Sequence, residues 1–259
     1  MRTQLYTLLI AIVSLALASG CVSQRTLDGK SQPAQQFDAQ EAAQTRLALG
    51  LQYLRSGNFE QAKANLERAL SYTPDNPDVY TGLAFYYQQV RDPQQAESYY
   101  RQALKLQPTD GNNYNNLGVL LCNQGRFAEA EQQFQRAIDQ PGYVKVAGTY
   151  ENLARCANLA GQWQLADQYY QLALNHSGGS VAMLESYATF LLAQGNYPKA
   201  AEVIAQRADF PQLSASYLWL EVQLAHAQRN NNKRDEFGAL LLSRFPQSDQ
   251  ARNYQQLNK

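Results

Sequence analysis

The sequence predicts an all-α fold in which about six helix-turn-helix repeats stack into a superhelical solenoid. Two observations support this prediction. The stretch from Asn113 to Pro141 matches an earlier stretch of the chain when it is moved back by 34 residues, and it matches again after a further 34. Within each copy, apolar and small residues return at helical spacing on both sides of a tight turn. A self-match at this period is typical of stacked helix pairs and not of one closed core.

The first three copies are expected at about residues 43–76, 77–110 and 111–146. Their matching positions are Leu49, Gly50, Tyr53, Ala62, Leu66, Ala69 and Pro74, then Leu83, Ala84, Tyr87, Ala96, Tyr100, Ala103 and Pro108, then Leu117, Gly118, Leu121, Ala130, Phe134 and Ala137. This set resembles the tetratricopeptide repeat (TPR), so the resemblance implies a TPR superhelix. Gly50 and Gly118 are expected where the two helices of a pair cross, because small residues let the backbones approach.

Three further copies are expected at about residues 147–180, 181–213 and 214–247. The fourth follows a short insertion around Pro141 and Gly142, and the fifth loses the pattern near Phe210. The sixth keeps helical periodicity without the Gly and Ala positions, so we expect it to be the end cap of the array. The repeats then fill residues 42–259.

Residues 1–20 have the pattern of an export signal. Arg2 is followed by an apolar run from Leu5 to Leu17, which is too short to span a bilayer, and by small residues up to Gly20. Ala18 to Cys21 resembles a bacterial lipobox, with Ala18 where Leu is usual, and this implies that Cys21 is acylated. The alternative is an ordinary secretory signal followed by an unrelated Cys. The resemblance also implies the outer membrane, because the second mature residue would be Val22 and not Asp.

Residues 21–41 are polar and poor in large apolar side chains, so we expect a lipidated flexible tether between membrane and array. Lys plus Arg and Asp plus Glu number 22 each in the whole chain. This balance gives no basic face for nucleic acid, and we expect no nucleic-acid partner.

The sequence offers little for catalysis. Its two histidines, His176 and His226, have no Cys, His or carboxylate at metal-ligand spacing, and it has neither a phosphate-binding loop nor a Ser nucleophile elbow. We therefore expect no enzyme activity, no metal, no cofactor and no small-molecule substrate.

Cys122 and Cys156 are one repeat length apart, but the insertion moves them to different positions of their helices. Two residues turn a helix by about 200°, so one Cys is expected to point toward the next repeat and the other back toward it. With Cys21 used by lipid, the remaining count is even, and the periplasm is oxidising. We predict a disulfide between repeats 3 and 4. The alternative is a pair of small buried thiols.

In TPR arrays the first helix of each pair lines a concave groove. The resemblance places an apolar patch there, followed by a polar floor. The predicted groove residues are Leu47, Leu51, Leu54, Phe85, Asn112, Asn115 and Val119, and the groove positions of repeat 4 are Glu151, Arg155 and Asn158. Apolar side chains on a surface not needed for stacking predict a peptide-binding site. The alternative is that some of these leucines pack on the tether or on an N-terminal cap.

The lipobox, the tether, the repeat number and the segment from Leu242 to Pro246 together resemble the type IV pilus biogenesis lipoproteins of the PilW/PilF family. This resemblance implies a pilotin, an outer-membrane lipoprotein that binds the secretin subunit of the pilus machine and promotes its localisation and multimerisation. The alternative is a periplasm-facing TPR lipoprotein that serves as a scaffold for cell-wall enzymes or for outer-membrane barrel assembly.

Overall fold

The computed structural model describes residues 26–27, 30–31 and 37–257. In this part of the chain six helix pairs follow one another and a last helix closes the array, which confirms the all-α TPR solenoid. The pairs are α2 (Ala39–Arg55) with α3 (Phe59–Tyr72), α4 (Pro77–Gln89) with α5 (Pro93–Leu106), α6 (Gly111–Asn123) with α7 (Phe127–Ile138), α8 (Val146–Leu159) with α9 (Trp163–His176), α10 (Val181–Ala193) with α11 (Tyr197–Ala208), and α12 (Ala215–Ala227) with α13 (Asn231–Arg244). The last helix is α14 (Asp249–Leu257).

Two short strands, β1 (Thr26–Leu27) and β2 (Lys30–Ser31), pair antiparallel within the expected tether. The expected signal peptide and Cys21 lie outside the described residues. None of the helices described is long and apolar enough to cross a membrane.

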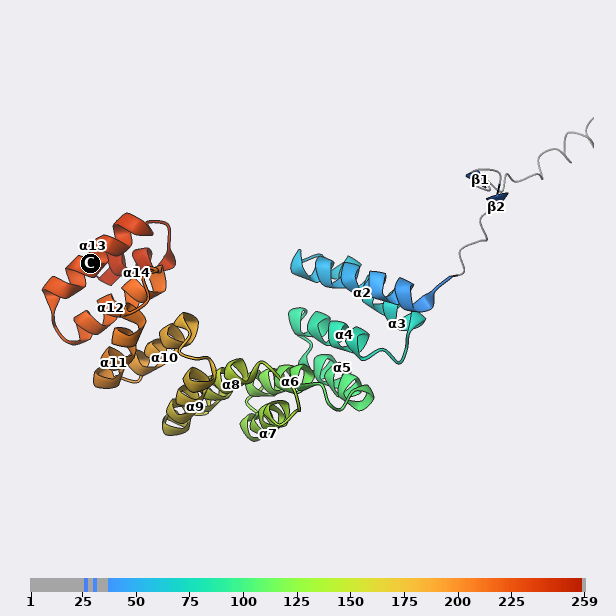
Figure 1. Ribbon diagram of the computed structural model, residues 1–259, viewed down its shortest axis with the longest axis horizontal. Helices are drawn as coiled ribbons and strands as arrows, with labels where there is room; N and C mark the ends of the chain where they lie inside the picture. Colours follow the sequence, from blue (N-terminus) through green and yellow to red (C-terminus); the bar gives the residue numbers. More distant parts are fainter. Residues whose placement is uncertain (1–25, 28–29, 32–36, 258–259) are drawn as a thin grey trace, which may run out of the picture.

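The helix pairs form a curved stack (Figure 1). We call the first helix of each pair the A helix and the second the B helix. The A helices α4, α6, α8 and α10 lie toward the hollow of the curve, and their B helices lie outside (Figure 1). The A helices therefore line the concave face.

Local sequence signals fix the ends of these helices. Asp38, Asn58, Asn76, Asp92 and Asp110 each precede a helix and accept a hydrogen bond from a backbone N–H of its first turn. The turn between the A and B helices needs a left-handed residue, which is Gly in four pairs. In the second and sixth pairs it is an arginine, Arg91 with φ 61° and Arg229 with φ 57°.

Small residues stand where the helices of a pair cross. A Cβ atom at Gly50 would lie 2.7 Å from Cγ of Leu66, and one at Gly118 would lie 2.7 Å from Cδ1 of Phe134. On the facing B helices one alanine of each of the first five pairs is fully buried: Ala62, Ala96, Ala130, Ala166 and Ala200. The predicted close approach of the two backbones is confirmed.

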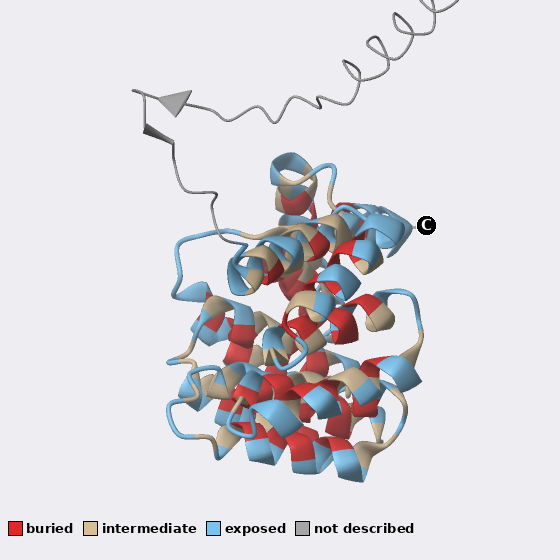
Figure 2. Cartoon of the chain, turned by 90° about the vertical axis from the view of Figure 1, so that its right-hand side faces the viewer, coloured by how far each residue is buried: buried red, intermediate tan, exposed pale blue. Residues whose placement is uncertain are grey.

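The buried apolar residues form three clusters, each shared by two or three consecutive repeats. Figure 2 shows these residues between the stacked helices, with the turns exposed. Because no repeat buries its apolar face alone, the fold depends on stacking between neighbours.

The C-terminal end differs from the prediction. The sixth pair is not the end cap, because α14 follows it and packs on α12 and α13. Tyr254 of α14 is 7% exposed, and its ring occupies the space that a side chain at Gly238 of α13 would need. Sequence periodicity missed this helix because it is a single helix and not another pair.

A buried ion pair holds the segment where the repeat pattern is lost, between α11 and α12. Arg207 is 1% exposed, and its Nε donates to Glu185 of α10 at 2.7 Å. Its Nη2 donates to the backbone oxygen of Gln212 at 2.7 Å, and Ser214 donates to the same carboxylate of Glu185 at 2.8 Å. The irregular connection is therefore fixed by hydrogen bonds instead of by repeat packing.

Candidate protein-binding groove

Side-chain hydrogen bonds link the A helices across the concave face. Thr81 of α4 donates to Asn113 of α6 at 2.9 Å. The same kind of link runs from Thr149 to Asn115 at 3.1 Å, from Ser186 to Glu151 at 2.7 Å, and from Gln194 to Asn158 at 3.0 Å. These bonds join α4, α6, α8 and α10 in sequence. The concave face is therefore built before any partner binds.

The predicted apolar patch is only partly free. Leu47 and Leu54 are half-buried and pack on the cluster of repeats 1 and 2. A Cβ atom at Gly82 of α4 would lie 2.9 Å from Cδ1 of Leu47 and 3.7 Å from Cδ2 of Leu51. The prediction that these leucines are not needed for stacking is wrong, because they fill the space above Gly82. Phe85, in contrast, is 38% exposed.

Some residues of the predicted polar floor hold helices together, and others are exposed to solvent. Asn112 is exposed and its side chain bonds to Asp110 at the start of α6. The side-chain oxygen of Asn115 accepts from Thr149 and from Asn152 at 3.0 Å, so it holds α8 in place. Val119 is half-buried against the central cluster. The patch and this floor thus follow one another along the A helices, and Phe85 and Asn112 are exposed whereas the other five residues are half-buried.

The structure is hollowed elsewhere on the A helices, over α8, α10 and α12. A hollow of about 380 Å³ between repeats 4 and 5 adjoins one of about 650 Å³ between repeats 5 and 6. Both are lined by Thr189 and Ala193 of α10, so they form one groove, which we call the distal groove. Its other lining residues include Arg155, Asn158 and Leu159 of α8, Leu192 of α10, Tyr197 of α11, Trp219, Gln223, His226 and Ala227 of α12, Arg229 of the turn, and Leu257 of α14.

The sequence predicts only part of this groove: Arg155 and Asn158 of repeat 4 are expected groove positions, and the other lining residues are not. Three of its apolar residues are exposed, Leu159 at 64%, Tyr197 at 39% and Leu257 at 38%. Leu159 and Leu192 stand in the last turns of their A helices, where Leu54 stands in the first repeat. Extending the predicted groove positions into repeats 5 and 6 would have found part of the site, but Leu257 belongs to the helix that the sequence did not predict.

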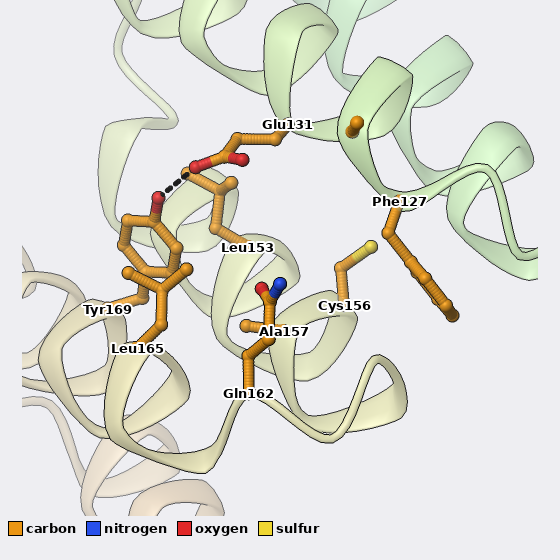
Figure 3. Close-up of a pocket in the computed structure, with 9 residues that line it drawn as sticks. Phe127, Glu131, Leu153, Cys156, Ala157, Gln162, Leu165 and Tyr169 are labelled. Atoms are coloured by element: carbon orange, nitrogen blue, oxygen red, sulfur yellow. Dashed lines mark hydrogen bonds between the residues drawn. The ribbon is translucent and has the colours of Figure 1, made fainter.

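The predicted cysteine pair lies beside a separate small cavity. Cys122 of α6 and Cys156 of α8 are joined by a disulfide, with their Cα atoms 5.7 Å apart. The cavity next to Cys156 holds about 90 Å³ between α7, α8 and α9, well below the roughly 300 Å³ at which ligand pockets begin (Figure 3). Across it Tyr169 donates to Glu131 at 2.6 Å, and burial together with this bond raises the pKa of Tyr169 (Figure 3). We assign this cavity to packing.

In the described residues no group of three or more His, Cys, Asp or Glu side chains could hold a metal ion.

Comparison with known proteins decides the family. Two tetratricopeptide repeat models match residues 41–109 and 81–144. A type IV pilus assembly protein, PilF of Pseudomonas aeruginosa, is 30% identical over 217 residues, which are 83% of this chain and 85% of that protein. The chain belongs to the PilF/PilW family of type IV pilus biogenesis proteins.

Solved structures agree with this family assignment. The structure of Pseudomonas aeruginosa PilF matches with a TM-score of 0.66 and 27% identity, over 85% of this chain and 99% of that one. The structure of PilW, described as a widely conserved type IV pilus biogenesis factor, matches with a TM-score of 0.69 and 26% identity, also over 85% and 99%. An uncharacterised protein of Haemophilus influenzae is 36% identical over 160 residues, 62% of this chain and 85% of that protein. The predicted resemblance to PilW/PilF is confirmed.

Proposed function

We propose that this protein is a pilotin, an outer-membrane lipoprotein that faces the periplasm, binds the secretin subunit of the type IV pilus machine and promotes its localisation and multimerisation. The observation that supports the proposal most is the identity to PilF along 83% of the chain. A role in type IV pilus biogenesis follows from the family. The secretin, the lipid and the membrane belong to the proposal.

In this proposal the lipid on Cys21 localises the protein to the outer membrane. Buried acyl chains contribute about 0.8 kcal/mol per CH₂, so two or three chains anchor a protein stably on a membrane. The first helix begins at Ala39, 18 residues after Cys21. A fully extended tether of that length spans roughly 60 Å, which keeps the array close to the membrane.

In the proposal the concave face binds the secretin. We place the secretin on the first three A helices, over Leu47, Leu51, Leu54, Phe85, Asn112, Asn115 and Val119, because these repeats follow the tether directly. Their side chains leave part of their surface free while holding the stack, so the site exists before binding and little ordering cost is paid. No chemical step is needed for this role.

Two phenylalanines offer a matched test of this placement. Phe85 on α4 and Phe59 at the start of α3 are both 38% exposed. Phe85→Asp should reduce the amount of secretin that copurifies with the protein from detergent-solubilised membranes, whereas Phe59→Asp should not. Equal copurification by the two variants would contradict the placement.

Deleting the gene tests the function itself. We expect loss of heat-resistant secretin multimers, of surface pili and of twitching motility. Intact pili with altered envelope integrity would instead support a scaffold for cell-wall enzymes or barrel assembly. A Cys21→Ser variant separates the lipid from the array: secretin rings should form in the wrong membrane or not at all, and normal rings in the outer membrane would contradict the lipid step.

A further inference from the structure

The distal groove has a charge pattern that differs from the rest of the molecule. The chain as a whole has as many acidic as basic residues. The groove is lined by Arg155, His226 and Arg229 and by no carboxylate. Arg155 and Arg229 are exposed, and neither forms an ion pair within the part of the chain that the structure describes. This surface therefore favours an occupant with negative charge.

Two acidic side chains on α8 and α10 are already engaged in hydrogen bonds. Glu151, one helical turn before Arg155, accepts from Ser186 at 2.7 Å. Glu185 on α10 is bound to the buried Arg207 and to Ser214. The first bond joins α8 to α10, and Arg207 compensates the charge of Glu185. Within the described residues neither carboxylate forms an ion pair with Arg155 or Arg229.

Between the two arginines the groove is mostly apolar, with polar residues such as Gln223 and His226 also in its lining. Arg155 lies on α8 and Arg229 follows α12, so they stand at opposite sides of the groove with α10 between them. The hollow of about 650 Å³ between them, lined by Leu192, Trp219 and Leu257, is large enough for bulky apolar side chains. Adjacent packed helices are roughly 10 Å apart, so two such steps make about 20 Å. At about 3.3 Å per residue, an extended segment of about six residues spans this distance.

We propose that the distal groove is a second docking site, which takes an extended peptide segment of about six residues with apolar side chains in the middle and a carboxylate near each end. The apolar side chains enter the hollow beside Trp219, and the carboxylates face Arg155 and Arg229. The site is separate from the placement of the secretin on the first three A helices and does not depend on it. A protein with both sites can hold two partner segments at once.

Two labelled peptides test the charge requirement. One has the sequence Asp-Leu-Phe-Val-Leu-Asp between Gly-Ser flanks, and the other has Lys in place of each Asp. Each is titrated with the full-length protein in detergent and followed by fluorescence anisotropy, with a protein-free titration to measure binding to detergent. The acidic peptide should bind at least about tenfold more tightly, and added salt should reduce the difference. Equal binding, or tighter binding of the Lys peptide, would overturn the proposal.

The two arginines of the A–B turns provide a matched pair of variants. Arg229 and Arg91 are both exposed and have the same left-handed conformation, but only Arg229 lines the distal groove. Arg229→Glu should weaken binding of the acidic peptide about fivefold. Arg91→Glu makes the same charge change elsewhere and should leave binding unchanged. An equal loss in both variants would mean that net charge alone attracts the peptide, and the site would be wrong.

A blocking variant tests the location without removing a contact. Ala193 lines both parts of the distal groove and is exposed, and Ala208 at the end of α11 is exposed as well. Ala193→Trp should abolish binding of the acidic peptide, whereas Ala208→Trp should bind as the unchanged protein does. Circular dichroism of each variant shows whether it is folded. Normal peptide binding by a folded Ala193→Trp variant would exclude the groove as the docking site.

Discussion

Reduction of the disulfide between Cys122 and Cys156 should destabilise the middle of the array. The bond joins two residues that are 34 apart in the sequence. In the chain-entropy model, closing a loop of this length removes roughly 4 kcal/mol of unfolded-state entropy at 25 °C. Both cysteines are buried and belong to the central cluster, so reduction should remove the crosslink while the side chains keep their packing.

The loss should be local, because each repeat of a solenoid contacts only its neighbours. Urea unfolding of the oxidised and reduced protein measures the total change. Amide hydrogen exchange then locates it: backbone amides of α6 and α8 should exchange faster after reduction, by at most two to three powers of ten for a change of roughly 4 kcal/mol. Amides of α2 and α12 should change far less.

A double variant, with Cys122→Ala and Cys156→Ala, is the control. Reductant should lower the urea midpoint of the unchanged protein and have no effect on the double variant. Thiol labelling of the unfolded, non-reduced protein should find neither thiol free. If oxidised and reduced protein unfold at the same urea concentration, the bond does not constrain the unfolded chain and the reasoning is refuted.

Three further predictions concern the helix crossings and one ion pair. Gly118→Leu should lower the free energy of unfolding by about 1 to 3 kcal/mol through overpacking, whereas Gly148→Leu, in open space on α8, should not destabilise the array in the same urea titration. Gly238→Ala should displace Tyr254 and make α14 sensitive to protease, and it should add nothing once Tyr254 is already replaced by Ala. Burial would raise the pKa of Asp167, but hydrogen bonds from a lysine and a tyrosine outweigh burial and lower it. A carboxyl group whose pKa is lower in the folded than in the unfolded protein stabilises the fold at pH values above its ordinary pKa. This stabilisation is lost as the pH falls through the folded-state pKa. The difference in stability between the unchanged protein and Asp167→Asn should therefore shrink between pH 5 and pH 2.

The fold could be predicted because one local pattern is repeated. Each repeat has a small residue such as Gly118 at the helix crossing and a bulky residue such as Phe134 facing it. In the structure these two residues are in contact as the pattern predicts. Contacts between adjacent repeats need no long-range information. The single helix α14 could not be predicted in this way, since the fit of Tyr254 onto Gly238 occurs once in the chain and has no copy to compare with.

The binding surface was harder to predict, because a groove position does not determine how much of a side chain is left free. Leu47 and Phe85 both occupy positions that line the groove of TPR arrays. Leu47 packs over Gly82 because that residue of the next repeat has no side chain, whereas Phe85 remains exposed. Exposure thus depends on the size of a neighbour about 34 positions away. The distal groove depends in addition on α14, which contributes Leu257.

The joint between repeats 3 and 4 explains how a curved array with an irregular insertion can present fixed surfaces. The insertion breaks the repeat period here, and this joint has the only disulfide within the described residues. The ring of Tyr143 in the insertion covers Gly111, and its hydroxyl lies 2.7 Å from that of Thr149, which in turn donates to Asn115. Covalent and polar bonds therefore replace the regular packing that the insertion removes. These bonds fix α6 against α8, so the first three A helices are held in place relative to α8, which is one wall of the distal groove.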